Sequence, residues 1–584
     1  MGSPLFHAKV ERFLGANGLR LEDVDAYCVI ESPDGSILAG GGIRKDTLKC
    51  LAVAESARSE GLLAPIVSRL LELGSDYSDH KVFTKPGNRA IFESLGFHLV
   101  AAAPEAILMT DGRELDPYCQ SLCQQSGQGR NGVIVMNANP FTRGHAYLAG
   151  KALEQVDRLF IIPVREDVSR FPYAERKAMM EAWAADDPRI TVLDGSQWQI
   201  SALTFPTYFL KDLSTAAETQ MRLDIDLFAR HIAPALGIAV RFVGTEPLDA
   251  LTARYNALMR QILPEHGIEM IEIPRLCEGE PVSASRVRQA LDEGSFARAA
   301  ALTPPTTHPY LLADLAAQAL QQELDTPLKP GLVGPDGPGA HSDMDYALMQ
   351  RSIAALRPWF GRMAALGSSF HGSSVESVAE LRQLGIDAEK AMLAATGGVN
   401  THRGAIYSLG LAIAAASAAD QRSMDIVDYQ EFMRTTMGKI SHSIISNALK
   451  DSELHRTAKS SAMGNSHAKG AREMALDGYK ELYESWLPYY RSVKGRPYDR
   501  QRTLLLIMST LDDTCVIKRA SAERARQVKQ EAADLLEKMP DQVGNDVWSE
   551  GLRRLCDQYA TEGISCGGAA DMLALTIFID TITS

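Results

Sequence analysis

Residues 137–145, with the sequence NANPFTRGH, combine groups that suit a nucleotide phosphate. They follow an apolar run of the kind found in buried strands, residues 132–136, and lead into a helical pattern near Ala146. The N-terminus of a helix offers unpaired N–H groups and the positive end of its dipole. Gly144 lets a phosphate lie against the backbone, and His145 can donate to phosphate oxygens. The pattern predicts a binding site for a nucleotide phosphate.

A second polar segment, residues 282–288 with the sequence VSASRVR, opens another helical pattern about 140 residues later. Serine hydroxyls and N–H groups at such a helix start can hold phosphate groups. Arg288 can offset the charge of departing pyrophosphate. Mg²⁺ is expected to share that task.

The two segments together resemble the paired signatures of the nucleotidylyltransferase superfamily, in which a carboxylate or phosphate attacks the α-phosphorus of ATP. The best matching positions are Thr142, His145, Ser285 and Arg288. The resemblance implies catalysis by Thr142 and His145. It implies ATP binding by Asn139, Gly144, Ser283, Ser285 and Arg288.

The wider pattern Asn-x-Asn-Pro-Phe-Thr-x-Gly-His is similar to that of the citrate lyase ligase family, and the similarity covers roughly residues 1–303. It implies that ATP adenylates acetate and that pyrophosphate is released. Acetyl would then pass to the thiol of the prosthetic group on the acyl carrier subunit of citrate lyase, leaving AMP. ATP and acetate are therefore the expected substrates, and the carrier subunit is the expected partner.

Residues 51–63 and 88–97 resemble the pyrophosphate-binding loop and a later motif of the N-acetyltransferases. Leu63 stands where the final glycine of the first motif is expected, and its side chain would crowd a phosphate near the backbone. This region is therefore expected to dock the CoA-like arm of the carrier, or to be a structural domain without a ligand. No catalytic residue is assigned before residue 131.

Four segments of the last region carry groups that suit a triphosphate and a metal. They are residues 326–333 (TPLKPGLV), 339–345 (GAHSDMD), 396–404 (TGGVNTHRG) and 565–571 (SCGGAAD). Lys329 supplies a positive charge, and Asp343 and Asp345 can present oxygens to Mg²⁺. Because side chains two residues apart do not share a helix face, these aspartates are expected in a loop or at a helix start.

These segments resemble triphosphoribosyl-dephospho-CoA synthase over roughly residues 310–584. That family joins C1 of the ribose of ATP to the 2′-hydroxyl of dephospho-CoA and expels adenine, which makes the precursor of the citrate lyase prosthetic group. The resemblance implies ATP binding by Lys329, Gly331, Gly397, Gly398, Asn400, His402 and Arg403. This sequence departs from the motifs of that family at two places. Leu328 interrupts the usual Thr-Pro-Lys-Pro, and residues 511–520 stand where an Arg-Gly-Gly is expected.

Loss of adenine builds positive charge on the sugar, so nearby carboxylates can stabilise the transition state or accept the hydroxyl proton. Asp343, Asp345 and Asp571 are the catalytic candidates, and Asp343 and Asp345 are also the candidate metal ligands. The sequence does not divide the roles of metal ligand and base among them.

Arg165, Lys211 and residues 244–246 are weaker candidates for contacts with ATP. Arg165 and residues 244–246 each follow a strand candidate, at the edge where parallel sheets bind their ligands. An exposed arginine and an ordinary loop explain them at least as well.

The elements that must position these residues fall into three regions. Residues 1–125 alternate short strand candidates with a helical stretch, which predicts an α+β domain that resembles the acetyltransferases. Residues 130–303 alternate strands with helices, which predicts an α/β, Rossmann-like parallel sheet of the nucleotidylyltransferase type. Residues 308–584 are rich in helix formers and predict an all-α domain. The strand candidates of the parallel sheet are residues 132–136, 158–164, 190–193, 240–244 and 270–274.

Length and composition agree with a multidomain enzyme. The 584 residues exceed the roughly 250 to 300 that one core supports. A net charge of −13 without a Lys/Arg run argues against a nucleic-acid partner. No signal-peptide pattern or apolar stretch of about 18 residues occurs, so we expect no membrane association and a cytoplasmic location. The eight cysteines are scattered, as reduced thiols would be.

The expected function is a bifunctional maturation enzyme for citrate lyase. The same chemistry could serve malonate decarboxylase, whose carrier bears the same group. One half could instead be a non-catalytic scaffold that binds carrier or nucleotide, as Leu63 and the altered segment around Arg519 suggest. A plain coenzyme adenylyltransferase is a further alternative, which would form a dinucleotide instead of AMP.

Overall fold

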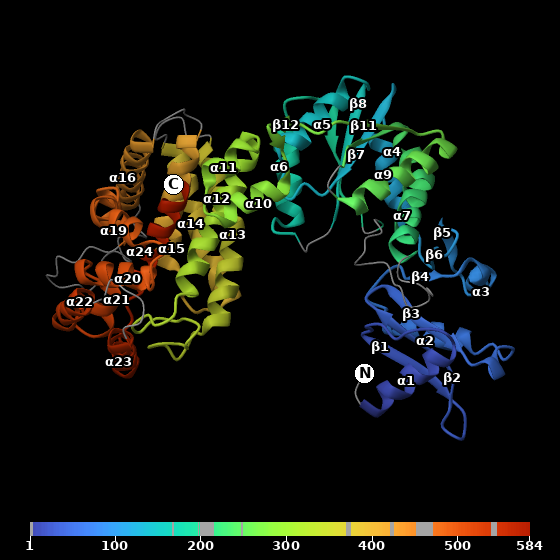
Figure 1. The fold of residues 1–584 in the computed structure, drawn as a ribbon, viewed down its shortest axis with the longest axis horizontal. Coiled ribbons are helices and arrows are strands. Elements are labelled where there is room, and N and C mark those ends of the chain that lie inside the picture. Colours follow the sequence, from blue (N-terminus) through green and yellow to red (C-terminus); the bar gives the residue numbers. More distant parts are fainter. Residues whose placement is uncertain are drawn as a thin grey trace. The chain divides into compact units, whose positions relative to one another are not determined.

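The computed structural model describes residues 4–165, 169–196, 198, 215–246, 249–368, 375–420, 426–450, 471–538 and 546–584. Its backbone divides into two compact units, Met1–Val282 and Ser283–Ser584 (Figure 1). Lys211, one of the weaker candidates for a phosphate contact, lies outside the described residues.

A six-stranded sheet opens the N-terminal unit, in the order β1-β2-β3-β4-β6-β5. Its strands are β1 (Ala26–Glu31), β2 (Ile37–Arg44), β3 (Thr47–Val53), β4 (Lys81–Thr84), β5 (His98–Ala102) and β6 (Ile107–Thr110). Only β3 and β4 are parallel neighbours, and α2 (Leu63–Leu73) makes the crossover that a parallel pair needs. The apolar face of α2 packs on the sheet through Ile66, Val67 and Leu70. Helices α1 (Pro4–Ala16) and α3 (Arg89–Ser94) complete this part.

Five parallel strands form a second sheet, in the order β11-β10-β7-β8-β9. They are β7 (Asn131–Met136), β8 (Arg158–Pro163), β9 (Ile190–Val192), β10 (Ile238–Gly244) and β11 (Glu269–Ile273), which confirms each strand candidate within two residues. The connecting helices include α5 (Arg143–Leu153), α6 (Tyr173–Ala184), α7 (Ala216–Leu227) and α9 (Ala250–Ile262). Strand order reverses between β7 and β10, so their carboxyl ends border the crevice in which such sheets bind ligands.

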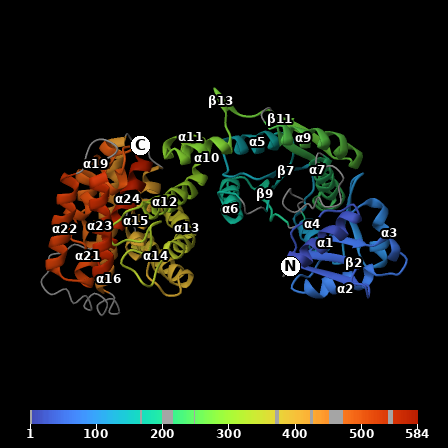
Figure 2. The same ribbon diagram turned by 60° about the horizontal axis from the view of Figure 1, so that its bottom comes forward.

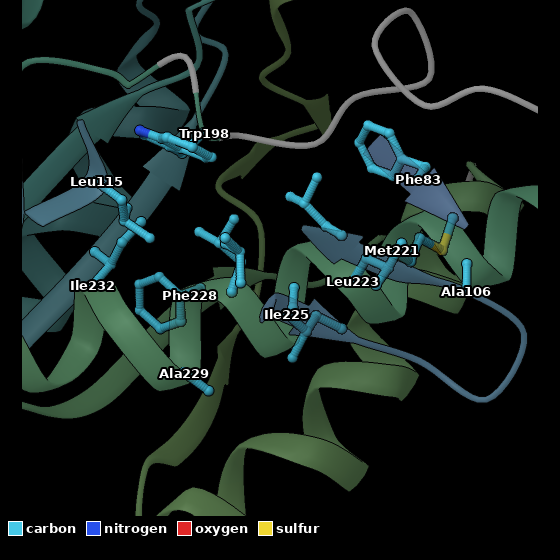
Figure 3. Close-up of a cluster of buried hydrophobic side chains, with 14 of the residues drawn as sticks. Phe83, Ala106, Leu115, Trp198, Met221, Leu223, Ile225, Phe228, Ala229 and Ile232 are labelled. Carbon is cyan, nitrogen blue, oxygen red and sulfur yellow. The ribbon is translucent and has the colours of Figure 1, made fainter. Parts of the chain in front are cut away.

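The two sheets of the N-terminal unit share one hydrophobic core (Figure 3). Met221, Leu223 and Ile225 of α7 belong to the same cluster as Phe83 of β4 and Leu115, the first residue of α4 (Leu115–Gln125).

Hydrogen bonds reinforce this junction. Asp226 accepts from the N–H of Ala102 at 2.8 Å, and Nε2 of His231 lies 2.8 Å from the carbonyl oxygen of Val100. His231 belongs to a π-helical turn, Phe228–Ile232, which follows α7. The first sheet is therefore built onto the second and is not a separately tethered body.

The C-terminal unit is helical, as the sequence predicts. Among its described residues, no strand longer than an isolated bridge between Gly334 and Gly337 occurs. Its helices are α10 (Ala284–Asp292), α11 (Phe296–Ala301), α12 (His308–Leu324), α13 (Tyr346–Ser368), α14 (Val375–Ala395), α15 (Arg403–Asp420), α16 (Ile426–Lys450), α18 (Ala471–Leu476), α19 (Leu487–Val493), α20 (Asp499–Thr510), α21 (Thr514–Arg519), α22 (Ala522–Glu537), α23 (Asp546–Glu562) and α24 (Gly567–Ile582).

Two helices, α15 and α24, form the centre of this unit (Figure 2). Both are apolar on nearly every side, and such helices are stable only when other helices surround them. They pack on each other, and α12 and α13 also pack on α15. The glycine-bearing segments 396–404 and 565–571 lead into these two buried helices. None of the described helices is long and apolar enough to span a membrane.

Candidate functional site

Thr142 and His145 form a reciprocal cap at the start of α5, directly after the loop that leaves β7. The Thr142 hydroxyl accepts from the N–H of His145 at 3.3 Å, and Nδ1 of His145 accepts from the N–H of Thr142 at 3.0 Å. A backbone N–H can only donate, so Nδ1 must be unprotonated. The proton of the neutral ring therefore lies on Nε2, which is a hydrogen-bond donor.

Surroundings keep this imidazole neutral. Burial, and next the positive charge of Arg275, lower the pKa of His145 to about 4. The ring stacks on Phe141 with centroids 5.7 Å apart, and Phe141 in turn contacts Trp183. At neutral pH, His145 therefore offers one oriented N–H instead of a positive charge.

Gly144 and Asn139 both make contacts that stabilise this loop. A methyl group added at Gly144 would lie 2.8 Å from the carbonyl oxygen of Val282, so the backbone packing already favours glycine. The side-chain oxygen of Asn139 accepts from the N–H of Phe171 at 3.1 Å. ATP binding by either residue stays a prediction.

Arg176 of α6 stabilises the loop after β7 through several hydrogen bonds. Its side chain is fully buried and donates to the carbonyl oxygens of Phe171 (3.0 Å) and Val164 (2.9 Å). It also donates to the backbone and side-chain oxygens of Asn137, each at 2.8 Å. Sequence reasoning missed this residue, because an arginine within the segment YAERKAMM looks like a solvent-exposed helix position.

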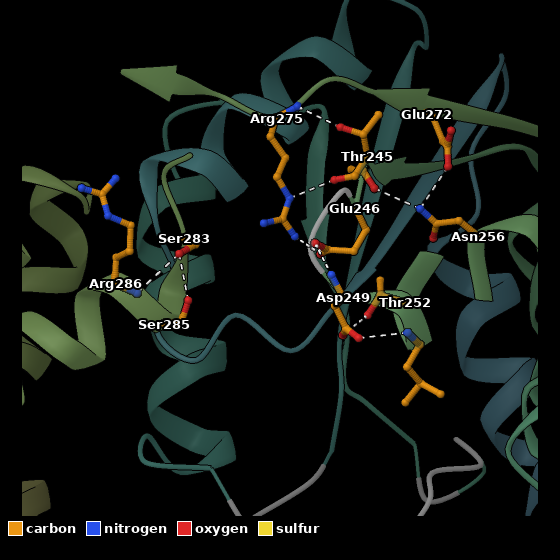
Figure 4. Close-up of polar contacts among 12 residues, drawn as sticks. Thr245, Glu246, Asp249, Thr252, Asn256, Glu272, Arg275, Ser283, Ser285 and Arg286 are labelled. Atoms are coloured by element: carbon orange, nitrogen blue, oxygen red, sulfur yellow. Dashed lines mark hydrogen bonds and ion pairs between the residues drawn. The ribbon is translucent and has the colours of Figure 1, made fainter. Parts of the chain in front are cut away.

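Arg275, which follows β11, is a second functional candidate that the sequence did not reveal (Figure 4). Its Nε donates to the carbonyl oxygen of Thr245 at 2.9 Å, and its Nη2 pairs with Glu246. Residues 244–246, a weaker candidate for an adenosine contact, therefore anchor an arginine at the carboxyl edge of the sheet. The other weaker candidate, Arg165, lies over the ring of Tyr173 at 5.8 Å.

Ser283, Ser285 and Arg288 belong to the C-terminal unit. Ser283 is the N-cap of α10: its hydroxyl accepts from the N–H of Arg286 at 3.4 Å and lies 2.9 Å from the hydroxyl of Ser285 (Figure 4). The helix start expected at this segment is thus present. Phosphate binding by Ser283, Ser285 and Arg288 stays a prediction.

Three of the sequence segments in the helical unit meet around Gly331. This residue has a φ of +69°, and a methyl group there would overlap the carbonyl oxygen of Ile564. The N–H of Ala340 donates to the carbonyl oxygen of Gly331 at 3.1 Å. Nε2 of His341 lies 2.8 Å from the hydroxyl of Ser565.

His341 is oriented by Arg519, the last residue of α21. Nη2 of Arg519 donates to Nδ1 of His341 at 3.2 Å, so Nε2 carries the ring proton and donates to Ser565. Burial, followed by the charge of Arg519, lowers the pKa of His341. The segment that departs from the expected Arg-Gly-Gly therefore still brings an arginine to these loops.

Lys329 is engaged by a partner that the sequence did not suggest. Its side chain is 1% exposed, and Nζ donates to the backbone oxygen of Glu323 at 2.7 Å and to its carboxylate at 2.5 Å. Burial lowers the pKa of this ammonium group. Phosphate binding by Lys329 stays a prediction, and the contact that the structure describes is an internal ion pair.

Asp571 lies among buried acidic groups. Burial, then the charges of Asp513 and Glu323, raise its pKa well above the usual value, while an N–H of Ala405 lowers it. Asp513 accepts from the N–H groups of Cys515 (2.7 Å) and Ala569 (3.0 Å). Tyr479 and Cys515 also sense the charge of Asp571. Sequence reasoning found Asp571 through its motif but missed Asp513 and Glu323, which stand outside the glycine-bearing segments.

His402 has an unpartnered ring nitrogen. The residue is 3% exposed, its Nδ1 lies 2.7 Å from the hydroxyl of Ser352, and its Nε2 has no hydrogen-bond partner among the described residues. Burial, and next the charge of Lys329, lower the pKa of His402 to about 4. The segment before it turns through Gly397 and Gly398, whose φ angles of +65° and +93° favour glycine.

Asn400, Arg403 and Asp345 lie at helix starts, and Asp343 lies in the bend before α13. Asn400 accepts from the N–H of Arg403 at 3.2 Å, and Arg403 pairs with Glu389. Asp345 accepts from the N–H of Leu348 at 2.7 Å, which confirms the expected helix start. Asp343 lies 3.8 Å from Nδ1 of His341, and both aspartate side chains are exposed. Within the described ranges, no three His, Cys, Asp or Glu residues gather into a metal-binding group.

Comparisons with known proteins agree with two different activities. Residues 131–311 match the family described as the citrate lyase ligase C-terminal domain, and residues 309–584 match the ATP:dephospho-CoA triphosphoribosyl transferase family. Relatives named citrate (pro-3S)-lyase ligase from Escherichia coli and Klebsiella pneumoniae are each 39% identical, over 52% of this chain and 90% and 92% of their own lengths. A relative from Stutzerimonas stutzeri, named "Probable 2-(5''-triphosphoribosyl)-3'-dephosphocoenzyme-A synthase", is 39% identical over 47% of this chain and 91% of its own.

Proposed function

The chain belongs to both the citrate lyase ligase and the triphosphoribosyl-dephospho-CoA synthase families, and we propose that it matures citrate lyase by two separate reactions. It is an enzyme of ligase and transferase type. One reaction acetylates the prosthetic-group thiol of the acyl carrier subunit. The other makes the precursor of that group from ATP and dephospho-CoA. Both reactions serve a single unusual group, which gives their fusion in one chain a biochemical reason.

The ligase reaction is supported by the oriented, neutral His145 at the carboxyl edge of the parallel sheet. An oxygen of acetate attacks the α-phosphorus of ATP, the bond to the bridging oxygen breaks, and pyrophosphate leaves with that electron pair. Nε2–H of His145 donates to a phosphate oxygen whose negative charge grows in the transition state. The carrier thiolate then attacks the acetyl carbon, and AMP leaves.

Binding of ATP at this site is assigned to the two signatures. Asn139 and Gly144 belong to the loop whose backbone meets the α-phosphate, with Thr142 as the residue that orients His145. Ser283, Ser285 and Arg288 are assigned to the β- and γ-phosphates, because the first turn of α10 offers hydroxyls, N–H groups and a guanidinium.

The transferase reaction is supported by the buried carboxyl of Asp571. The bond from ribose C1 to adenine breaks with its electrons on adenine, and the 2′-hydroxyl oxygen of dephospho-CoA bonds to C1. Asp571 keeps a proton at a pH at which an ordinary carboxyl has lost it, so we assign it protonation of the departing adenine. The proton released by the hydroxyl restores the acid. ATP binding is assigned to Lys329, Gly331, Gly397, Gly398, Asn400, His402 and Arg403.

Asp343 and Asp345 are suitable ligands for Mg²⁺. Both present exposed carboxylate oxygens, and Asp345 uses one of its oxygens to cap α13. Mg²⁺ commonly takes one or two carboxylates and completes its shell with substrate phosphates and water. These two aspartates would therefore hold Mg²⁺, which would offset the charge of the triphosphate.

We further propose that the chain has three domains, residues 1–125, 130–303 and 308–584, and that each has its own function. The first would have an acetyltransferase-like fold and dock the CoA-like arm of the carrier. The second would be the nucleotidylyltransferase-like ligase, and the third the all-α synthase. The cytoplasm, where ATP and dephospho-CoA occur, is the proposed location.

Product analysis tests this assignment. With ATP, acetate and the thiol form of the citrate lyase carrier, the intact chain should form AMP and acetylated carrier. With ATP and dephospho-CoA it should release adenine. Acetylation of the malonate decarboxylase carrier alone would show that this chain serves malonate decarboxylase and not citrate lyase. A dinucleotide product would indicate a coenzyme adenylyltransferase, and absence of either product would make that half a scaffold.

A further inference from the structure

A short hairpin follows the last strand of the parallel sheet and contacts the start of α5. Strands β12 (Cys277–Glu278) and β13 (Glu280–Pro281) form it, and the N–H of Val282 donates to the carbonyl oxygen of Leu276 at 3.0 Å. The carbonyl oxygen of Val282 lies against Gly144, and Glu278 pairs with Arg143. The hairpin is thereby held on the first turn of α5, which contains His145.

Arg275 stands at the root of this hairpin, and the end of β10 fixes its direction. Its backbone N–H donates to the Thr245 hydroxyl at 3.3 Å, and its side chain binds Thr245 and Glu246 (Figure 4). The Glu246 side chain is 8% exposed, whereas that of Arg275 is 29% exposed. The carboxylate therefore lies on the protein side of the pair, and the guanidinium keeps an accessible face at the ligand-binding edge.

The electrostatic environment of His145 points in the same direction. The charge of Arg275 opposes protonation of the His145 imidazole. The guanidinium of Arg275 therefore lies near enough to this ring for its charge to act there.

We infer that Arg275 is a further catalytic residue of the adenylating site and that it binds a phosphate oxygen of ATP together with His145. This inference rests on the proposed ligase function. Two donors of different kinds, a neutral imidazole and a guanidinium, would share the negative charge that builds as the bridging oxygen leaves. Thr245 and Glu246 are positioning residues for Arg275. Arg275 itself gains and loses no bond or proton in the step.

Three variants of the full chain test the inference. Arg275→Met should lower kcat/KM for AMP formation about 100-fold, the effect of removing one donor to a transition-state oxyanion. Arg275→Lys, which keeps the charge without the fork, should retain more activity. Arg260→Met is the matched control, because Arg260 makes an exposed ion pair with Glu272, and it should behave as the unmutated chain.

A second measurement separates a charge role from a structural one. Without the Arg275 charge, the pKa of His145 should rise from about 4, so the acid limb of AMP formation should move to higher pH in Arg275→Met. It should not move in Arg275→Lys, which keeps the charge, and if the methionine variant unfolds, a limb that moves in Arg275→Lys would overturn the inference. An unmoved limb in a folded Arg275→Met protein, or activity equal to Arg260→Met, would overturn the inference. No AMP from the unmutated chain would instead refute the ligase function.

Discussion

Asp571 occupies the space that a side chain at Gly404 would need. A methyl group added at Gly404, in the first turn of α15, would overlap Oδ2 of Asp571 in α24. Glycine at this position therefore does not serve a flexible loop. It allows the buried carboxyl to approach the helix start closely enough to meet the N–H of Ala405.

Gly404→Ala should displace Asp571 and lower adenine release about 100-fold, because a shift of roughly 1 Å in a reacting group can cost that factor. AMP formation should stay unchanged. Adenine and AMP can be separated by chromatography from the same reaction. Gly385→Ala is the control, since a methyl group in that part of α14 meets no atom within 4 Å. Equal adenine release by the two variants would contradict the placement of Asp571.

His145→Ala should abolish AMP formation, with a loss of about 100-fold or more, and leave adenine release intact. His145→Gln should retain part of the activity, because its amide N–H can reach the position of Nε2. With a pKa of about 4, the ring is neutral above pH 5, so activity should fall only as pH decreases towards 4. An inflection near pH 6.5 would show that His145 titrates normally. Loss of both activities together would show that the two sites are not separate.

Arg176→Met should destabilise the N-terminal unit by about 3 kcal/mol and abolish AMP formation, because it leaves several buried carbonyl oxygens without donors. Arg176→Lys should recover little, since one ammonium group cannot reach Phe171, Val164 and Asn137 together. The midpoint of thermal unfolding measures the effect. The exposed pair of Arg260 should contribute no more than about 1 kcal/mol, so Arg260→Met again provides the baseline.

Glu323→Gln tests the proton that we assign to Asp571. An acid must be protonated to act, so adenine release should fall as pH rises through the pKa of Asp571. Removing the negative charge of Glu323 makes the ionised form less unfavourable and lowers that pKa. The alkaline limb should therefore move to lower pH. Glu431→Gln, at an exposed pair with Arg434, should leave the limb in place. A move to higher pH would refute the acid role.

Much of the fold could be predicted because its signals are local. Apolar runs such as residues 132–136 and 158–164 are buried strands, and Ser283 and Asp345 cap helices as their positions indicated. The departure at residues 511–520 could not be judged in this way. Arg519 and His341 are 178 residues apart in the sequence, and only the folded chain shows that Arg519 contacts and orients His341.

The sequence by itself determined the two families, the glycine-bearing segments and the helices and strands that carry them, because periodicity, capping and motif spacing act over a few residues. Only the tertiary structure decided which polar groups share an environment. Arg176, Arg275, Glu323 and Asp513 look like ordinary polar residues in sequence, yet the folded chain gives each a specific partner. The physical reason is that charge and hydrogen bonding gain their strength from exclusion of water, and exclusion depends on segments far apart in the chain.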